Sequence, residues 1–92
     1  MTGEELKDAR RLIGNYFGEQ ISFADMARIV GLANPSDNGK DTIRKWEDGD
    51  GPSGPVATLV NLIVAGLDQS APPQVRAFFD RCISQRLGLE PF

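Results

Sequence analysis

The pattern of apolar and polar positions along the chain predicts helices throughout. Apolar residues recur three and four positions apart over most of the sequence. No stretch shows the strict alternation that is expected of a half-buried strand. We therefore expect an all-α fold, with helices at residues 3–17, 22–31, 39–48, 54–67 and 70–86.

The starts of the helices are marked by capping residues. Thr2 with Glu5, and Ser22 with Asp25, each have the form of a capping box. In such a box a hydroxyl and a carboxylate bind amides that the first helical turn leaves free. Ser53 is placed to cap the fourth helix in the same way.

Residues 33–40 separate the second helix from the third and have the sequence Ala-Asn-Pro-Ser-Asp-Asn-Gly-Lys. Proline, asparagine, aspartate, serine and glycine in one short run predict an irregular loop. Asn38 is then placed to cap the third helix. In that helix we expect Ile43 and Trp46 to face the core and the basic residues to face solvent.

The fourth and fifth helices carry most of the remaining apolar side chains. The fourth is apolar on most sides, so we expect it to be the central, buried helix. The fifth has a broad apolar side that includes Val75, Phe78 and Phe79. A bundle of this size has little core with which to cover so wide a stripe, so we expect part of it to face a second subunit.

The composition is that of an ordinary globular protein. The 92 residues fit one domain, and 40% of them are hydrophobic and 25% charged. No apolar run approaches the roughly 18 residues that span a bilayer. The first residues lack the apolar core of a signal peptide, so we expect a cytoplasmic protein.

The residues that usually carry catalysis or hold metals are scarce. The chain has no histidine and one cysteine, Cys82, so it lacks the commonest general base and can build no internal disulfide. The acidic residues are scattered among basic ones at helical spacing. We therefore expect no enzyme activity, no metal and no cofactor, and we interpret Cys82 as a small apolar residue of the interior.

The layout of the second and third helices indicates a binding function. Two short helices between a first helix and an apolar fourth are typical of a helix-turn-helix, whose second short helix enters the major groove of DNA. The net charge of −3 argues mildly against nucleic-acid binding. Binding depends on where the charges lie, however, and not only on their sum.

The sequences of these two helices favour that interpretation. ISFADMARIVGL (residues 21–32) and TIRKWEDG (residues 42–49) resemble the lambda-repressor/Cro-like helix-turn-helix family. The shared features are a capped Ala-acidic-apolar-Ala series, a glycine followed by an apolar residue, and a Thr-Ile series that leads into Trp-Glu. The resemblance implies a five-helix lambda-repressor-like bundle, with a DNA-binding domain at residues 1–67. The C-terminal helix within residues 68–92 is then expected to pack on this domain, to form a dimer interface, or to do both.

The resemblance also implies a structural ion pair between Arg10 and Glu47. Two features depart from the family pattern. Ten residues, rather than about four, separate Gly31 from Thr42, so the turn is enlarged and either follows the DNA backbone or bulges out. Phe23 stands where many members have a glutamine that binds a phosphate, so either this chain does not bind a phosphate there or the helix docks differently.

The candidate DNA contacts lie on the third helix, in the segment before it and at the start of the second helix. Arg44 is the first choice for reading a base, because a guanidinium can bond both O6 and N7 of guanine. Lys40 and Lys45 are expected to contact phosphates, to which loop amides and the helix start at Ser22 offer further donors. The full set is Ser22, Asn34, Ser36, Asn38, Gly39, Lys40, Asp41, Thr42, Arg44 and Lys45.

The predicted function is a sequence-specific DNA-binding transcriptional regulator, most simply a homodimeric repressor that reads a palindromic operator with its third helix. The alternative is an antitoxin or a phage-encoded adaptor that keeps this fold and binds a protein partner. The acidic balance and the apolar side of the fifth helix favour the alternative. A plainer interpretation also stays open, in which the third helix is amphipathic and its charges are solvated surface.

Overall fold

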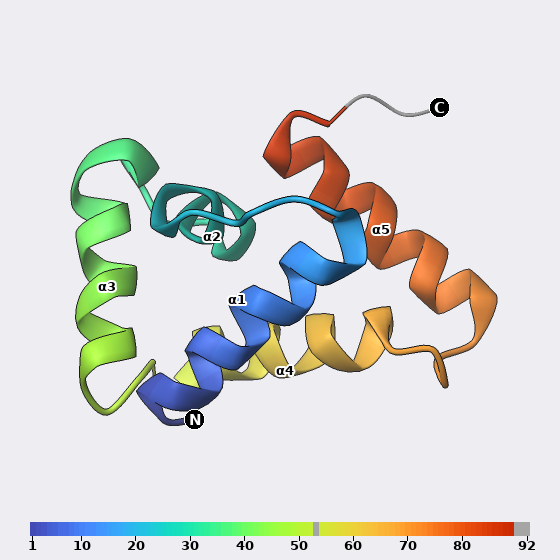
Figure 1. Cartoon of the computed structure of the whole chain (residues 1–92), viewed down its shortest axis with the longest axis horizontal. Coiled ribbons are helices and arrows are strands. Elements are labelled where there is room, and N and C mark those ends of the chain that lie inside the picture. The colour runs from blue at the N-terminus through green and yellow to red at the C-terminus, as the bar shows by residue number, and fades with distance from the viewer. Residues whose placement is uncertain (53, 90–92) are drawn as a thin grey trace.

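The computed structural model in Figure 1 describes residues 1–52 and 54–89. Over these residues the chain forms five α-helices, one short π-helical segment and no strand, so the predicted all-α class is confirmed. The elements are α1 (Gly3–Phe17), α2 (Phe23–Val30), η1 (Pro35–Gly39), α3 (Lys40–Asp48), α4 (Gly54–Leu67) and α5 (Pro73–Leu87). None of the helices in this part of the chain is long and apolar enough to cross a membrane.

Both predicted capping boxes form. The Glu5 amide donates to the Thr2 hydroxyl over 3.1 Å, and the Thr2 amide donates to the Glu5 carboxylate over 2.9 Å. This backbone hydrogen bond from Thr2 lowers the pKa of Glu5. Ser22 and Asp25 make the same pair of bonds at the start of α2. The expected Ser53 cap lies outside the described residues.

All five α-helices contribute to the core, and α3 and α5 lie at opposite ends of the molecule (Figure 1). Its largest fully buried side chains come from five different helices and are therefore brought together only by the fold. They are Leu6, Ile13, Met26, Ile29, Ile43, Val60 and Ile83. Along α1, Leu6, Ala9 and Ile13 are buried, and Tyr16 and Phe17 are partly buried against the same core.

The central helix is α2, and the prediction that α4 would be buried on most sides was wrong. The α2 helix packs against η1, α3, α4 and α5. In α4, Val60, Ile63 and Leu67 are buried, whereas the Leu62 side of the helix remains open and that residue is 55% exposed. The reason is that α1, α2 and α5 cover only one face of α4. Because α4 is apolar on most sides and covered on one face, it leaves apolar surface on the outside of the bundle.

The α4 and α5 helices approach closely at Gly66. The Phe79 ring lies so near the Gly66 backbone that a Cβ atom at position 66 would overlap it. Glycine is therefore required here for packing, and the helix continues through it to Leu67. This contact turns one edge of α5 toward the core and leaves its other edge outward.

Polar contacts hold the remaining length of α5. Arg86 Nη1 donates to the Ile29 carbonyl oxygen over 2.8 Å, at the end of α2. The Tyr16 hydroxyl of α1 donates to Asp80 Oδ2 over 2.9 Å. The outer apolar side of α5 stays uncovered as predicted, since Phe78 is 61% exposed. Its coverage by a second subunit stays a prediction.

The effect of the Tyr16–Asp80 hydrogen bond on the pKa of Tyr16 can be measured by titration, because Tyr16 is the only tyrosine of the chain. Burial, followed by the hydrogen bond and the negative charge of Asp80, raises the pKa of Tyr16 above its ordinary value of 10.0. We expect Asp80→Asn to move the pKa down toward that value, as measured by tyrosinate absorbance against pH. The neutral phenol stabilises the fold below pH 10.0, and this contribution is lost as pH rises through the raised pKa. Identical titration curves for the two proteins would contradict the role given to Asp80.

Candidate nucleic-acid interface

The expected ion pair between Arg10 and Glu47 forms and joins α1 to α3. Arg10 Nε lies 2.7 Å from Glu47 Oε2, and Arg10 Nη2 lies 3.0 Å from Glu47 Oε1. The side chain of Glu47 is 4% exposed and that of Arg10 is 17% exposed. A guanidinium and a carboxylate that meet through two parallel bonds have one preferred geometry. The pair therefore fixes the direction in which α3 leaves the core.

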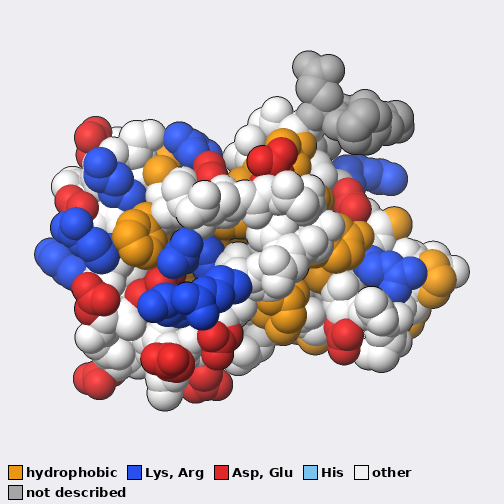
Figure 2. Space-filling model, in the orientation of Figure 1, with side chains coloured by type: hydrophobic (Ala, Val, Ile, Leu, Met, Phe, Trp, Pro, Cys, Tyr) orange, Lys and Arg blue, Asp and Glu red, His pale blue; other side chains and the backbone are white. Residues whose placement is uncertain are grey.

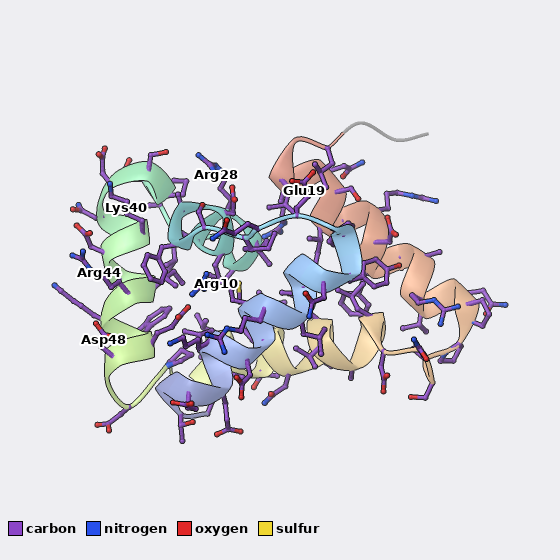
Figure 3. The ribbon with its side chains drawn as sticks, viewed as in Figure 1. Arg10, Glu19, Arg28, Lys40, Arg44 and Asp48 are labelled. Carbon is purple, nitrogen blue, oxygen red and sulfur yellow. The ribbon has the colours of Figure 1, made fainter. Side chains whose placement is uncertain are left out.

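The same guanidinium also holds the start of α2. Arg10 Nη1 donates to the Ile21 carbonyl oxygen over 2.7 Å, just before the helix begins. The Arg10 guanidinium also lies 4.7 Å from the centre of the Phe23 ring, in a cation–π contact. Phe23 thus has a structural role at the position where a phosphate-binding glutamine was considered. One side chain of α1 sets the positions of both α2 and α3 (Figure 3).

Most of the segment before α3 is helical, so the prediction of an irregular loop at residues 33–40 is correct for residues 33 and 34 and wrong for residues 35–40. After α2 ends, Gly31 adopts a left-handed conformation, and Asn34 does the same with φ = 50°. Pro35 then begins η1, which continues directly into α3. Only residues 31–34 lie outside the helices, so the turn itself has four residues. The additional length of the chain forms an extra helical turn and does not bulge out.

Packing against α2 explains the wide geometry of this extra turn. The Gly39 amide donates to the Asn34 carbonyl oxygen over 3.0 Å, five residues earlier, as in a π-helix. A Cβ atom on Gly39 would lie 3.2 Å from the Ala27 Cβ, so the segment approaches α2 closely. Asn38 lies inside this helical run. The prediction that it caps α3 was therefore wrong. Gly39 is buried and its amide is already bonded, so it has no donor to offer a phosphate.

The residues on the solvent side of η1 and α3 form what we call the α3 surface. They are Asp37, Asn38, Lys40, Asp41, Arg44, Lys45 and Asp48. In Figure 3, Lys40, Arg44 and Asp48 project away from the body of the protein. The set contains three basic and three acidic side chains, so its charge is balanced. Figure 2 shows the same mixture of blue and red over α3.

Within the α3 surface, some groups are already engaged. Arg44 Nη2 lies 3.3 Å from Asp41 Oδ1, and both side chains are about half exposed, at 58% and 46%. An exposed pair of this kind contributes little stability and is easily exchanged for another partner. The Thr42 hydroxyl donates to the Asn38 carbonyl oxygen over 2.9 Å, so its proton is directed into the helix. Lys40 and Lys45 make no ion pair with any described residue.

The start of α2 is less suited to an external anion than was predicted. The Ser22 hydroxyl already accepts from the Asp25 amide, and the Asp25 carboxylate accepts from the Ser22 amide. A phosphate that approached this helix end would meet the negative charge of Asp25. Ser22 is therefore a capping residue. The negative charge that stabilises a helix N-terminus is already supplied by Asp25.

Arg28 is a basic residue of this region that the sequence analysis missed. Arg28 Nη1 lies 3.0 Å from Asp25 Oδ1, and Arg28 Nη2 donates to Ser36 Oγ over 3.0 Å. The side chain is 39% exposed, and it connects α2 to η1 across the turn. Its spacing from Asp25 indicated a surface ion pair. The contact with Ser36 depends on the helical course of η1, which the sequence did not indicate.

Other kinds of site are poorly represented in the described structure. In residues 1–52 and 54–89, no three His, Cys, Asp or Glu side chains come together in a way that could hold a metal ion. A partly open groove of about 530 Å³ lies between α1 and the segment that follows it. Its lining includes Arg11, Asn15, Glu19 and Gln20. Cys82 is a free thiol and is half-buried, not fully buried as had been expected.

Comparison with models of protein families, with curated proteins and with solved structures finds no match for this chain. The function is therefore inferred from the geometry and charge of the α3 surface and from the residues that hold it in place.

The Arg10–Glu47 pair predicts a marked effect of removing one partner. Glu47→Ala leaves the largely buried Arg10 charge without a carboxylate, so we expect the free energy of unfolding to fall by about 3 kcal/mol. Urea denaturation monitored by circular dichroism measures this change. The double variant Arg10→Met/Glu47→Leu is expected to recover most of the loss, because it leaves no unpaired charge in the interior. An equally large loss in the double variant would contradict this explanation. Asp48→Ala, which changes an exposed acid on the same helix, is the control.

Proposed function

We propose that this protein is a sequence-specific DNA-binding regulator that acts as a homodimer and inserts the helix formed by η1 and α3 into the major groove. The observation that carries the proposal is the pair of short helices, α2 and α3, whose relative position is fixed by Arg10 while the outer side of α3 stays open. The major groove is about 12 Å wide and admits one α-helix. A second helix held across the first is the arrangement by which a helix-turn-helix presents its reading helix.

Three features support a lambda-repressor-like arrangement in particular. The pair between Arg10 and Glu47, which the sequence resemblance implied, is present. The turn at residues 31–34 has four residues, a typical length for a helix-turn-helix. The extra residues that separated the sequence from the family pattern extend the reading helix at its N-terminal end.

The charges on the α3 surface suggest how such a protein would bind. Lys40, Arg44 and Lys45 would provide the attraction to phosphates, and each phosphate contact makes the affinity more sensitive to salt. With only three cations on the helix, one subunit would bind weakly. Two subunits on a palindrome would double the contacts, with half-sites about 34 Å or a multiple of it apart. Occupation of a promoter by such a dimer would repress transcription.

The proposed dimer interface is the outer side of α4 and α5. Leu62, Val75 and Phe78 are large apolar residues that are 55%, 40% and 61% exposed. Exposed apolar residues that gather on adjacent helices are typical of an interaction surface. The α5 helix lies at the other end of the molecule from α3, so a partner on this helix would leave the α3 surface open (Figure 1).

A second candidate function is the binding of a protein partner, as in an antitoxin or an adaptor. The balanced charge of the α3 surface favours it, because DNA-binding helices usually carry a basic excess. The uncovered apolar side of α5 favours it as well. The binding experiment described next separates the two functions, because a protein adaptor would retain no duplex even at low salt.

Removing two cations from α3 tests the proposed DNA interface. Arg44→Ala/Lys45→Ala is expected to weaken binding to the DNA upstream of its own gene at least tenfold, because the variant has two fewer charges that attract phosphates. Fluorescence anisotropy at several salt concentrations, with a scrambled duplex alongside, measures the affinity and its salt dependence. The slope of log K against log salt is expected to fall by about 0.9 for each phosphate that the variant no longer binds.

The matched control is Arg11→Glu, which lowers the net charge by the same two units at an exposed position of α1. It is expected to bind as the unaltered protein does. Equal weakening in both variants would mean that only the total charge matters, and unchanged binding in the double variant would remove α3 from the interface. If no duplex is retained even at low salt, the protein-binding function is favoured.

The dimer is tested by sedimentation at micromolar concentration. We expect the unaltered protein to sediment as a dimer and Phe78→Asp to sediment as a monomer, because a carboxylate would be buried in the interface. Since Phe78 is 61% exposed in the single chain, the variant should keep its helical content and unfold at a similar temperature. A monomeric unaltered protein would contradict the dimer that we propose.

A further inference from the structure

The helix formed by η1 and α3 has distinct inner and outer faces. Gly39 and Ile43 are buried and mark the inner face. At about 100° per residue, positions 41 and 45 lie roughly half a turn away from Ile43. Position 38 precedes position 41 by about one turn and is itself exposed. Asn38, Asp41 and Lys45 thus form a row on the outer face.

The acidic residues at the start of this helix restrict where it can lie on DNA. Asp37 and Asp41 stand on either side of Asn38 in the sequence, and phosphates would repel both carboxylates. Electrostatic repulsion therefore disfavours a position of this turn along the sugar–phosphate backbone. The base edges of the major groove are different, because cytosine N4 and adenine N6 are hydrogen-bond donors. The charge pattern favours a position of the extra turn over bases, and Lys40, which lies away from this row, remains available to a phosphate.

Asn38 has an unbonded side chain on a helical backbone. Its backbone carbonyl oxygen accepts from the Thr42 hydroxyl, so the helix around it is ordered. Its carboxamide makes no hydrogen bond with any residue that the structure describes. A carboxamide can bind adenine N6 and N7 at once, as an acceptor and a donor. Arg44, by contrast, lies on the flank of the helix, about a quarter turn from Ile43.

We infer, on the basis of the DNA-binding function proposed above, that Asn38 is the principal specificity-determining residue and reads an adenine in each half-site. The turn Pro35–Gly39 then belongs to the reading helix, although its sequence resembles a loop. The first base contact is then made by Asn38, in this added turn, and not by Arg44 as the sequence predicted. The preferred ligand is duplex DNA in which an adenine faces the start of the reading helix.

Selection from a random duplex library, followed by anisotropy titrations, tests this inference. The unaltered protein is expected to select a motif with an invariant adenine. Asn38→Ala is expected to bind that motif roughly 10- to 100-fold more weakly and to bind equally well when the adenine is replaced. Its salt slope should not change, because the number of bound phosphates stays the same. Asn61→Ala, at an exposed asparagine of α4, is the control and should keep the full preference.

Each other outcome overturns the inference in a recognisable way. If Asn38→Ala keeps the adenine preference while Arg44→Ala loses a base preference, Arg44 is the reader and the proposed function stands. If Asn38→Ala binds all duplexes more weakly and with a smaller salt slope, the residue contacts a phosphate. If the unaltered protein selects no motif and retains no duplex at low salt, both the inference and the proposed function fail. The thermal unfolding of Asn38→Ala, expected to match that of the unaltered protein, excludes misfolding as the cause.

Discussion

The guanidinium of Arg10 is the group on which the candidate interface depends. It binds Glu47 of α3 through two bonds and donates a third bond to the Ile21 carbonyl oxygen. It also lies against the Phe23 ring of α2. A charge this far from water is tolerated only while its partners stay in place. Three segments that are distant in the sequence are therefore held in one arrangement, and the outer side of α3 is presented by a rigid support.

The balanced charge of the α3 surface and the uncovered side of α5 are consistent with one mode of action. In the DNA-binding function that we propose, a helix with equal numbers of basic and acidic side chains would gain little from phosphates, and its discrimination would come from hydrogen bonds to base edges. Weak binding by one subunit makes a second subunit valuable. The α5 helix is attached to α2 through Arg86 and to α1 through Asp80, while Phe78 faces outward. These contacts present an apolar side without involving α3.

Two of the errors of the sequence analysis have clear physical causes. Residues 33–40 were interpreted as a loop because proline, asparagine and glycine favour turns. The same segment has Pro35 at the first helical position and Asp37 in the first turn, which is also the pattern of a helix start. The close packing of Gly39 on Ala27 decides between the two, and no local signal shows it. Likewise, the apolar pattern of α4 does not determine how many helices will cover it.

The sequence by itself determined the features that depend on neighbours three or four residues apart. The capping boxes, the limits of α1 and α2, the inward Ile43 and the exposed cations of α3 all follow from local spacing. The pair between Arg10 and Glu47 required the resemblance to a family, because its partners are 37 residues apart. Only the tertiary structure decided the helical course of η1, the open face of α4 and the link from Arg28 to Ser36. Each of these depends on which surfaces meet when the helices pack, and composition and periodicity do not contain that information.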